Sequence, residues 1–417
     1  MLIMKEITHT LSMEILMAHD KKVYIYSDAA ICCVGKTWDY SLQQTLSNPN
    51  YKPNFQSLKF RETDFPVAMI SHSQLLPDFR GNKIENILTQ VIEQIQDEVK
   101  ICLQKYGPQR VGICLGSCDN GSEASLAAHK DYLERGSFPP GYLLNQQGPA
   151  YATSFVQSKL KTEGPAITIA TACASSATAV IEAAQLVLAN ICDAVVVVGV
   201  DIVSPTVFLG FNGLEAVSPT GCTPFSKNRR GITLGEAAAA LIVCKDKPNT
   251  ENYVQLLGFG ESADASHMTA PLESGEGAAV AMEKAIAMAG IDRRQISYIN
   301  LHGTGTPLND AMESKAVAKV FPQATSTEGF LKVSSTKAIT GHTLGAAGCL
   351  ELSICMRTLY DTEMNGLLPI HHWDGEIDSE LPALQFVEAG NRKNTAICMT
   401  NSFAFGGCNT SLIIEKE

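Results

Sequence analysis

The stretch Ala166-Ile167-Thr168-Ile169-Ala170-Thr171-Ala172-Cys173-Ala174-Ser175-Ser176 changes its periodicity at a single cysteine. Before Cys173, isoleucines alternate with smaller residues, as they do in a β-strand. After it, apolar side chains recur at helical spacing at Val180, Ala183, Ala184, Val187 and Leu188. A helix N-terminus presents unpaired N–H groups that stabilise a thiolate and can bind an oxyanion. Cys173 is therefore a candidate nucleophile, and a buried structural cysteine is the alternative.

The composition is that of a globular chain with a large core, because 45% of its 417 residues are hydrophobic and 18% are charged. The 32 basic and 43 acidic residues give a net charge of -11, which argues against nucleic acid or an anionic membrane as the main partner. No apolar run is long enough to span a bilayer. The odd count of thirteen cysteines, without framework spacing, favours a reducing cytoplasm over secretion. Neither Cys114 and Cys118 nor Cys32 and Cys33 have the spacing of a zinc site, so no metal is expected.

Short apolar strands alternate with helices from Val23 onward, which predicts an α/β fold with helices covering a largely parallel sheet. The strands expected are 23–26, 110–116, 166–172, 194–200, 253–258, 296–301, 331–335, 395–399 and 410–414. The helices expected are 83–104, the segment after Cys173, 275–289 with Gly290 as its C-cap, 310–320 and the segment after Gly345. The alternation occurs twice. The domains predicted are an N-terminal extension, 1–22, a half that carries the nucleophile, 23–250, and a second half, 251–417.

Two histidines in the second half also follow predicted strands. His302 lies in Asn300-Leu301-His302-Gly303-Thr304-Gly305-Thr306-Pro307-Leu308-Asn309-Asp310, where glycines and hydroxyls cannot continue the sheet. Lys337 and His342 lie in a second such junction. Sites in open α/β sheets form at strand ends of this kind. Each histidine alone could be a hydrogen-bonded structural residue, but three matching strand ends favour one shared site.

Five motifs, in order, resemble those of the β-ketoacyl-acyl carrier protein synthases, which are condensing enzymes of the thiolase-like superfamily. They are Thr171-Ala172-Cys173-Ala174-Ser175, Asp264-Ala265-Ser266-His267-Met268-Thr269, His302-Gly303-Thr304-Gly305-Thr306-Pro307, Lys337-Ala338-Ile339-Thr340-Gly341-His342 with Gly345-Ala346-Ala347-Gly348, and Asn401-Ser402-Phe403-Ala404-Phe405-Gly406-Gly407-Cys408-Asn409. The resemblance implies a thiolase-like fold, in which two related α/β halves form five α-β-α-β-α layers. It also implies an acyltransferase that condenses malonyl-acyl carrier protein with a Cys-bound acyl chain and releases carbon dioxide.

The resemblance implies a role for each site residue. Cys173 would take the acyl group, while His302 and His342 would hold the malonyl thioester and stabilise its enolate. The backbone N–H groups of Cys173 and Phe405 would form a second oxyanion site, with Phe405 also acting as a gate. Lys337 would supply an orienting charge, and Thr304 and Thr306 would bind the pantetheine arm. The supporting residues are Asp310 and Glu313, which could pair with Lys337, together with Glu351 and His267. No cofactor is expected apart from the phosphopantetheine that the carrier protein carries.

Several positions depart from the family pattern. Ala404 replaces the family's glycine between the two aromatics, and Glu215 stands where many members have a basic residue. Carrier proteins are acidic, so the candidate docking contacts that remain are Lys59, Arg61, Lys227, Arg229 and Arg230.

The resemblance also implies a homodimer that pairs the strands near 194–200 across a two-fold axis, and a heterodimer with a related subunit stays open. A thiolase is one alternative function, although thiolases use a second cysteine in place of one histidine. A non-catalytic chain-length partner subunit is another, although such subunits usually lack the nucleophile. The sequence leaves open whether the pathway is fatty-acid, polyene or polyketide synthesis.

Overall fold

The computed structural model describes residues 21–77, 79, 82–119, 121–325, 331–360, 366–392 and 396–417. The predicted N-terminal extension, 1–22, lies outside the described residues except for its last two. Of these, Lys22 forms an ion pair of 2.8 Å with Glu417 at the C-terminus. In the part of the chain that is described, no helix is long and apolar enough to cross a bilayer.

The strands of the described residues form a large mixed sheet, with one small hairpin beside it. The sheet contains β1 (Tyr24–Cys32), β2 (Gly35–Lys36), β5 (Val111–Gly116), β6 (Ala166–Ile169), β7 (Ala194–Asp201), β8 (Ala237–Cys244), β9 (Tyr253–Ala263), β10 (Tyr298–Asn300), β11 (Lys332–Ser334), β12 (Ile397–Phe403) and β13 (Cys408–Glu415). The hairpin pairs β3 (Gln56–Phe60) with β4 (Thr63–Val67). The sheet order is β11-β10-β12-β13-β9-β1-β8-β7-β5-β6, with β2 paired to β1.

This order repeats one topology twice. The first half runs β6-β5-β7-β8-β1, and the second runs β11-β10-β12-β13-β9, with the strands used in the same sequence order. In both halves the three strands at the outer edge are parallel to one another, and the two pairings nearer the middle of the sheet are antiparallel. The halves join through the antiparallel pair β1 and β9. The predicted boundary near residue 250 falls in the loop between β8 and β9.

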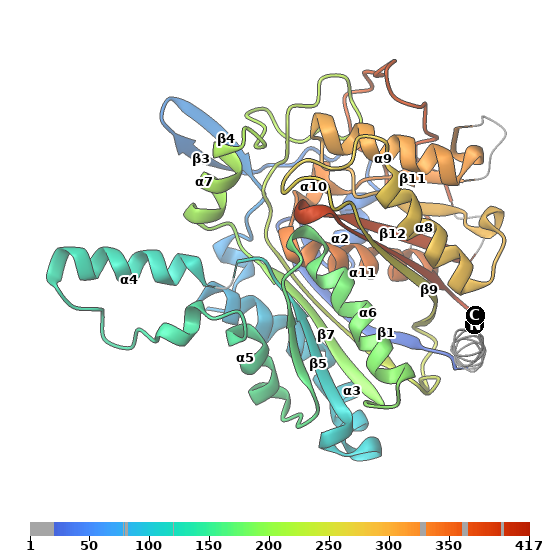
Figure 1. Ribbon diagram of the computed structural model, residues 1–417. Helices are drawn as coiled ribbons and strands as arrows, with labels where there is room; N and C mark the ends of the chain where they lie inside the picture. Colours follow the sequence, from blue (N-terminus) through green and yellow to red (C-terminus); the bar gives the residue numbers. More distant parts are fainter. Residues whose placement is uncertain are drawn as a thin grey trace, which may run out of the picture.

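Helices cover both faces of the sheet and also separate its halves (Figure 1). Helices α6 (Ser175–Leu188) and α11 (Ala347–Tyr360) pack against each other in the middle. The outer helices are α3 (Lys83–Tyr106) and α5 (Tyr151–Leu160) on the first half, and α8 (Glu276–Ala289) and α9 (Pro307–Val320) on the second. The remaining helices are α2 (Ser41–Leu46), α4 (Ser122–Arg135), α7 (Pro205–Gly213) and α10 (Lys337–Thr340). The result is the predicted five-layered α-β-α-β-α arrangement.

Local sequence explains these elements well where the hydrophobic pattern is strong. The Asn82 side chain caps α3 by accepting a hydrogen bond from Glu85 N, and Gly107 ends that helix with a φ of 85°. Its buried residues, such as Ile84, Leu88 and Ile95, recur at helical spacing. Every residue of β7 is buried, as expected for a strand with helices on both faces.

Two expectations about strands need correction, and one long strand of the main sheet was not predicted. The strand predicted over 166–172 ends at Ile169, because the chain leaves the sheet three residues before Cys173 to build a tight turn. Strand β8 was not predicted, since its Ala237–Ala240 run has no strand signature. The dimer strand predicted near 194–200 is wrong, because β7 is already paired with both β5 and β8. Within the described residues, the unpaired edge beside the nucleophile belongs to β6.

Candidate active site

Cys173 lies in a tight turn that connects β6 to α6. The turn is a short 3-10 helix, Ala172–Ala174, and Ala172 adopts a left-handed φ of 49°. Such a conformation is unfavourable for a residue with a Cβ, so surrounding contacts must hold it. Ser175 supplies them, because its hydroxyl donates to Ala172 O at 2.6 Å and accepts from Thr171 N at 3.0 Å. The turn places the thiol at the start of α6, as the periodicity predicted.

His302 lies in a loop after β10, and side chains of α9 hydrogen-bond to the backbone of this loop. Glu313, which is fully buried on α9, accepts hydrogen bonds from His302 N at 2.8 Å and from Gly303 N at 2.7 Å. Asp310, one helical turn earlier, accepts from Thr304 N at 3.0 Å and from Phe225 N at 2.7 Å. The two carboxylates therefore hold the backbone of the loop. The pairing with Lys337 that the sequence suggested is not formed.

Lys337 and His342 come from the junction after β11. Lys337 is 0% exposed, and its ammonium group donates to Glu351 on α11, which is 2% exposed. The Nδ1 atom of His342 accepts a hydrogen bond from Leu344 N at 3.2 Å, so its Nε2 atom carries the proton and is a donor. The backbone of His342 is also held, because its N–H donates to Thr233 O at 2.7 Å.

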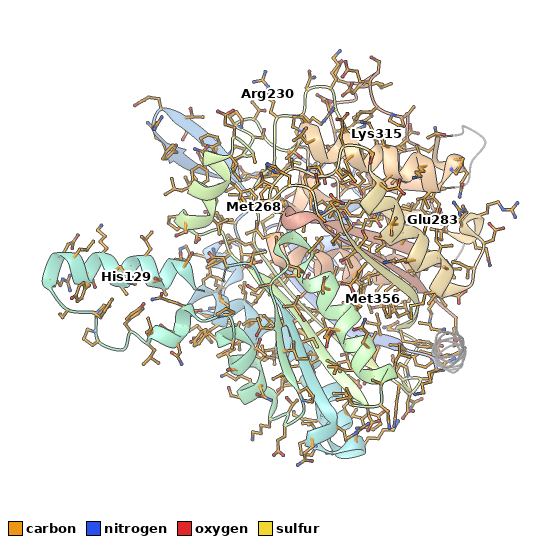
Figure 2. The ribbon with its side chains drawn as sticks, in the orientation of Figure 1. His129, Arg230, Met268, Glu283, Lys315 and Met356 are labelled. Carbon is orange, nitrogen blue, oxygen red and sulfur yellow. The ribbon has the colours of Figure 1, made fainter. Side chains whose placement is uncertain are left out.

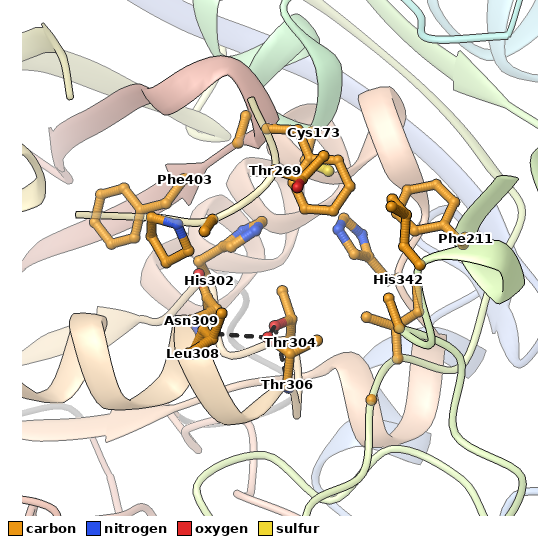
Figure 3. Close-up of a pocket in the computed structure, with 18 of the residues that line it drawn as sticks. Cys173, Phe211, Thr269, His302, Thr304, Thr306, Leu308, Asn309, His342 and Phe403 are labelled. Carbon is orange, nitrogen blue, oxygen red and sulfur yellow. Dashed lines mark hydrogen bonds between the residues drawn. The ribbon is translucent and has the colours of Figure 1, made fainter. Parts of the chain in front are cut away.

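These elements bring the cysteine and both histidines together in one buried cluster (Figure 3). One ligating atom from each of Cys173, His302 and His342 lies within 4.8 Å of the other two. The imidazole rings of His302 and His342 meet edge to face, with 5.3 Å between their centroids. A cavity of about 380 Å³ opens onto all three residues.

The same three atoms could ligate a soft divalent cation, but two features oppose one. The charge of Lys337 acts on all three residues, since it lowers the pKa of the thiol and of both imidazoles. In addition, Nε2 of His342 is protonated and has no lone pair to offer. The donor set therefore suits anionic species better than a resident metal.

Burial controls the protonation of the cluster. It raises the pKa of Cys173 to about 12; the Lys337 charge, together with the N–H groups of Cys173 and Phe405, opposes this rise, and Asp201 adds to it. Burial also lowers the pKa of His302 and His342 well below the usual range, so both rings are neutral. The resting cysteine is thus a thiol beside two neutral bases, whereas the sequence had predicted a thiolate.

The predicted gate and arm-binding residues line the same cavity. Phe405 stacks on Phe211 of α7, with 5.5 Å between the ring centroids. The hydroxyls of Thr304 and Thr306 lie 3.0 Å apart at the cavity wall. Thr306 also has a structural task, because its side chain caps α9 by accepting from Asn309 N.

Other predicted residues lie outside the cluster. His267 is exposed, and its Nδ1 atom accepts hydrogen bonds from Thr269 N and Ala270 N, so it orders a loop that borders the cavity. Lys227 and Arg229 form ion pairs with Glu376 and Asp378. Lys59, Arg61 and Arg230 are exposed, and Figure 2 shows Arg230 at the outer edge of the molecule.

One buried charged residue near Cys173 was missed. Asp201 ends β7 and is 0% exposed. The sequence signal for a buried charge was a carboxylate at the end of an otherwise apolar strand. Nothing in the local sequence shows which groups this carboxylate contacts.

A doubled α/β fold that presents a cysteine and two histidines at three strand ends defines a thiolase-like condensing enzyme. The comparisons with known proteins narrow this class. The family model described as "Beta-ketoacyl synthase, N-terminal domain" matches residues 84–249. The model described as "Beta-ketoacyl synthase, C-terminal domain" matches residues 253–371. The chain belongs to the β-ketoacyl synthase family, as the five motifs predicted.

Named relatives cover nearly the whole chain. A 3-oxoacyl-[acyl-carrier-protein] synthase 2 from Staphylococcus aureus is 31% identical, over 96% of this chain and 99% of its own length. Its counterpart from Coxiella burnetii is 34% identical, over 86% of this chain and 90% of its own. A chain of the solved structure "Ketosynthase (ApeO) in Complex with its Chain Length Factor (ApeC) from Xenorhabdus doucetiae" is 33% identical, with a TM-score of 0.84, over 95% of this chain and 98% of its own. The chain is thus a condensing enzyme of the acyltransferase class, and the thiolase and non-catalytic alternatives are not favoured.

Proposed function

We propose that this enzyme joins a Cys173-bound acyl chain to malonyl-acyl carrier protein, with loss of carbon dioxide. One observation carries the proposal: a buried thiol lies within 4.8 Å of two neutral imidazoles, in the wall of a cavity of about 380 Å³. Such a cavity suits a narrow thioester arm that reaches in from a protein surface. No cofactor is proposed beyond the phosphopantetheine of the carrier, because the thiol, the imidazoles and the backbone amides supply the groups that this chemistry needs.

Acyl transfer comes first. The Cys173 sulfur attacks the acyl thioester, and the proton of the thiol passes by way of a neutral imidazole to the departing pantetheine sulfur. Because burial raises the pKa of Cys173 to about 12, a base must take this proton as the bond forms. His302 suits the task, since its buried Nδ1 atom has no hydrogen-bond partner among the described residues. The N–H groups of Cys173 and Phe405 hold the developing oxyanion.

Condensation follows when malonyl-carrier protein binds. The malonyl carboxylate leaves as carbon dioxide, and its bonding electrons form an enolate whose oxygen faces the two histidines. His342 donates to this oxygen from Nε2, because its Nδ1 atom is already occupied by Leu344 N. The enolate carbon then attacks the acyl-Cys173 thioester, and the thiolate of Cys173 leaves and takes up one proton from solvent. Lys337 favours the anionic states through its charge.

Intact-mass measurement tests this function. Incubation with an acyl-carrier protein should add the mass of the acyl group to the wild type but not to Cys173→Ala. Cys102→Ala is the matched control, since Cys102 is a buried thiol on α3, outside the catalytic cluster, and its replacement should leave the adduct unchanged. A missing adduct, or an adduct that survives in Cys173→Ala, overturns the proposal.

We propose that the acyl class is set by the shape of the pocket beyond Cys173. The names of the relatives from Staphylococcus aureus and Coxiella burnetii support fatty-acid synthesis, whereas the likeness to a ketosynthase with a chain length factor supports a specialised system. Rates with saturated, unsaturated and aryl acyl-carrier proteins distinguish them, because a rigid conjugated chain needs a different cross-section from a flexible alkyl chain.

All thirteen cysteines are free thiols, which supports the proposal of a reducing cytoplasm.

The carrier protein is proposed to dock through exposed basic side chains, of which Arg230 directly precedes Gly231 in the cavity wall. Lys59, Arg61 and Arg230 are exposed, whereas Lys227 and Arg229 are already paired. Glu215 lines the cavity and is exposed, so it opposes an acidic carrier. We expect Arg230→Glu to raise the KM for carrier substrates and Glu215→Lys to lower it. Equal KM values in both variants would place docking elsewhere.

We propose that the enzyme pairs with a second copy, or with a related subunit, through the open edge of β6. The carbonyls of Pro165 and Ile169 accept hydrogen bonds from Ile113 N in β5 and from Ser117 N just after it, so Ala166 and Thr168 direct their backbone groups toward the open edge. The solved complex of a similar ketosynthase with its chain length factor supports a partner subunit. Thr168→Pro should reduce the mass measured by light scattering, whereas Thr168→Val keeps the N–H group and should not. A monomeric wild type whose mass does not rise with any related subunit overturns this proposal.

A further inference from the structure

Asp201 is a buried carboxylate next to the catalytic cluster for which the proposed reaction has no chemical role. It is 0% exposed and accepts hydrogen bonds at both oxygens. Its Oδ1 atom accepts from the Ser117 hydroxyl at 2.9 Å and from Asp119 N at 2.9 Å. Its Oδ2 atom accepts from Gly345 N at 2.6 Å, and Cys118 N lies within 3.1 Å of both oxygens.

These donors belong to two loops that are far apart in the sequence. Ser117–Asp119 forms the turn after β5, and the Cys118 sulfur lies 3.9 Å from the Ser175 hydroxyl that holds the nucleophile turn. Gly345 lies three residues after His342, in the segment whose Leu344 N–H orients the His342 ring. A single side chain therefore connects the turn after β5, which contacts Ser175, with the loop that orders His342.

The two loops are closely packed where Asp201 connects them. A Cβ on Gly345 would lie 2.7 Å from Asp201 Oδ2 and 2.9 Å from Cys118 N. Both distances are below van der Waals contact, so only glycine lets the His342 loop approach this closely. The two loops thus meet over a hydrogen-bonded carboxylate with no room for another atom.

We propose that Asp201 is a positioning residue, which fastens the His342 loop to the turn after β5 and thereby sets the spacing between His342 and Cys173. The inference rests on the proposed function for the role of His342 in the reaction. Both oxygens of an ionised carboxylate are needed, because each faces backbone N–H groups that water cannot reach. An amide in its place would turn an NH₂ group toward one of those N–H donors.

Electrostatics agree with this placement. The negative charge of Asp201 raises the pKa of Cys173, which means that the carboxylate acts directly on the thiol. Burial raises the pKa of Asp201 itself to about 6, while its N–H donors and the Ser117 hydroxyl oppose the rise. Asp201 is therefore ionised at pH 8, where the test is made.

The test compares Asp201→Asn with the wild type at pH 8. We expect kcat for condensation to fall roughly 10–100-fold with little change in KM, because His342 acts on charge that develops only in the transition state. We also expect Cys173 to react faster with iodoacetamide, by about tenfold for each unit by which its pKa falls. Peptide mass spectrometry reports this rate for Cys173 alone. A merely structural role would lower the melting temperature without speeding up this alkylation.

Asp193→Asn is the matched control. Asp193 precedes β7 at the other end of the same strand, is 7% exposed, and accepts from Arg110 at 2.8 Å. Its replacement should lower stability and leave both kcat and the alkylation rate unchanged. Gly345→Ala provides an independent variant, because its methyl group presses on the same contact from the opposite side, and it should lower kcat with KM retained.

Wild-type values of kcat and alkylation rate in a folded Asp201→Asn variant overturn the inference. If that variant does not fold, a folded Gly345→Ala with wild-type kcat overturns it instead. The failure of the proposed function is a separate outcome. A wild type without an acyl adduct refutes the proposed condensation. Alkylation needs no acyl substrate, so the alkylation rate of Asp201→Asn still tests whether Asp201 acts on Cys173.

Discussion

Replacing Lys337 with methionine should destabilise the protein more than replacing both members of its ion pair. Lys337 is 0% exposed and Glu351 is 2% exposed, while Glu351 Oε2 has no hydrogen-bond partner among the described residues. Removing one partner of such a buried pair costs about 3–5 kcal/mol, since the other charge stays buried and unpaired. Replacing both partners with apolar residues of similar volume is often close to neutral. We therefore expect a loss of about 3–5 kcal/mol in Lys337→Met and recovery of most of it in Lys337→Met with Glu351→Met.

Urea unfolding at pH 6 and pH 8 measures this difference. Burial raises the pKa of Glu351, so the folded single variant takes up a proton more readily than its unfolded chain. Its stability is then greatest at low pH and falls as the pH rises through the folded pKa. Lys319→Met is the control, because its ion pair with Glu276 is about half exposed and should contribute less than about 1 kcal/mol.

Activity separates the charge of Lys337 from its contribution to stability. The charge lowers the pKa of both His302 and His342, so its removal should shift the acidic limb of the kcat profile to higher pH. The double variant should remain folded, with kcat reduced at least about tenfold, which corresponds to about 1.4 kcal/mol. A single variant as stable as the double at pH 8 would refute the argument from burial. A double variant with wild-type kcat and an unshifted profile would refute the electrostatic role.

Further predictions concern the thiol, the His302 loop and the gate. Alkylation of Cys173 should speed up about tenfold per pH unit from pH 7 to pH 10, because burial raises its pKa to about 12, and a plateau below pH 9 would contradict this. Glu313→Gln should lower the free energy of unfolding by about 1–3 kcal/mol in urea melts, since one buried N–H of the His302 loop loses its acceptor, and it should also reduce kcat. Unchanged stability would show that other contacts hold the loop. Ala404→Gly removes a methyl group from the cavity wall next to Phe405, and should lower stability by less than about 1 kcal/mol while broadening the range of acyl lengths accepted. An identical chain-length profile would exclude this part of the gate from selectivity.

Predictions from local pattern held where the signal lies within a few residues. The change from alternation to helical spacing located the turn at Cys173, and glycines with hydroxyls marked the loop of His302. The capped, strongly amphipathic helix α3 was predicted almost to its ends. Strand β8 was missed because a run of alanines has no periodicity, and only burial between β1 and β7 makes it a strand.

The partners of buried charges could not be read in the same way. Lys337 was expected to pair with Asp310 or Glu313, yet these carboxylates hold backbone N–H groups and Glu351 on another helix receives the ammonium group. The dimer strand was misplaced because β7 has an apolar sequence that suits an interior position as well as an interface. Each of these outcomes depends on which strands become neighbours in the sheet.

By itself, the sequence indicated the doubled α/β architecture and the candidate site of one cysteine and two histidines, because periodicity and turn chemistry act between near neighbours in the chain. Only the tertiary structure decided that Cys173 rests as a neutral thiol, since burial in the assembled core sets its pKa. It also decided that Asp201 joins the turn after β5 to the loop of His342, and that β6 rather than β7 presents the open edge. The physical reason is common to all three: desolvation and long-range hydrogen bonds exist only after distant segments have packed together.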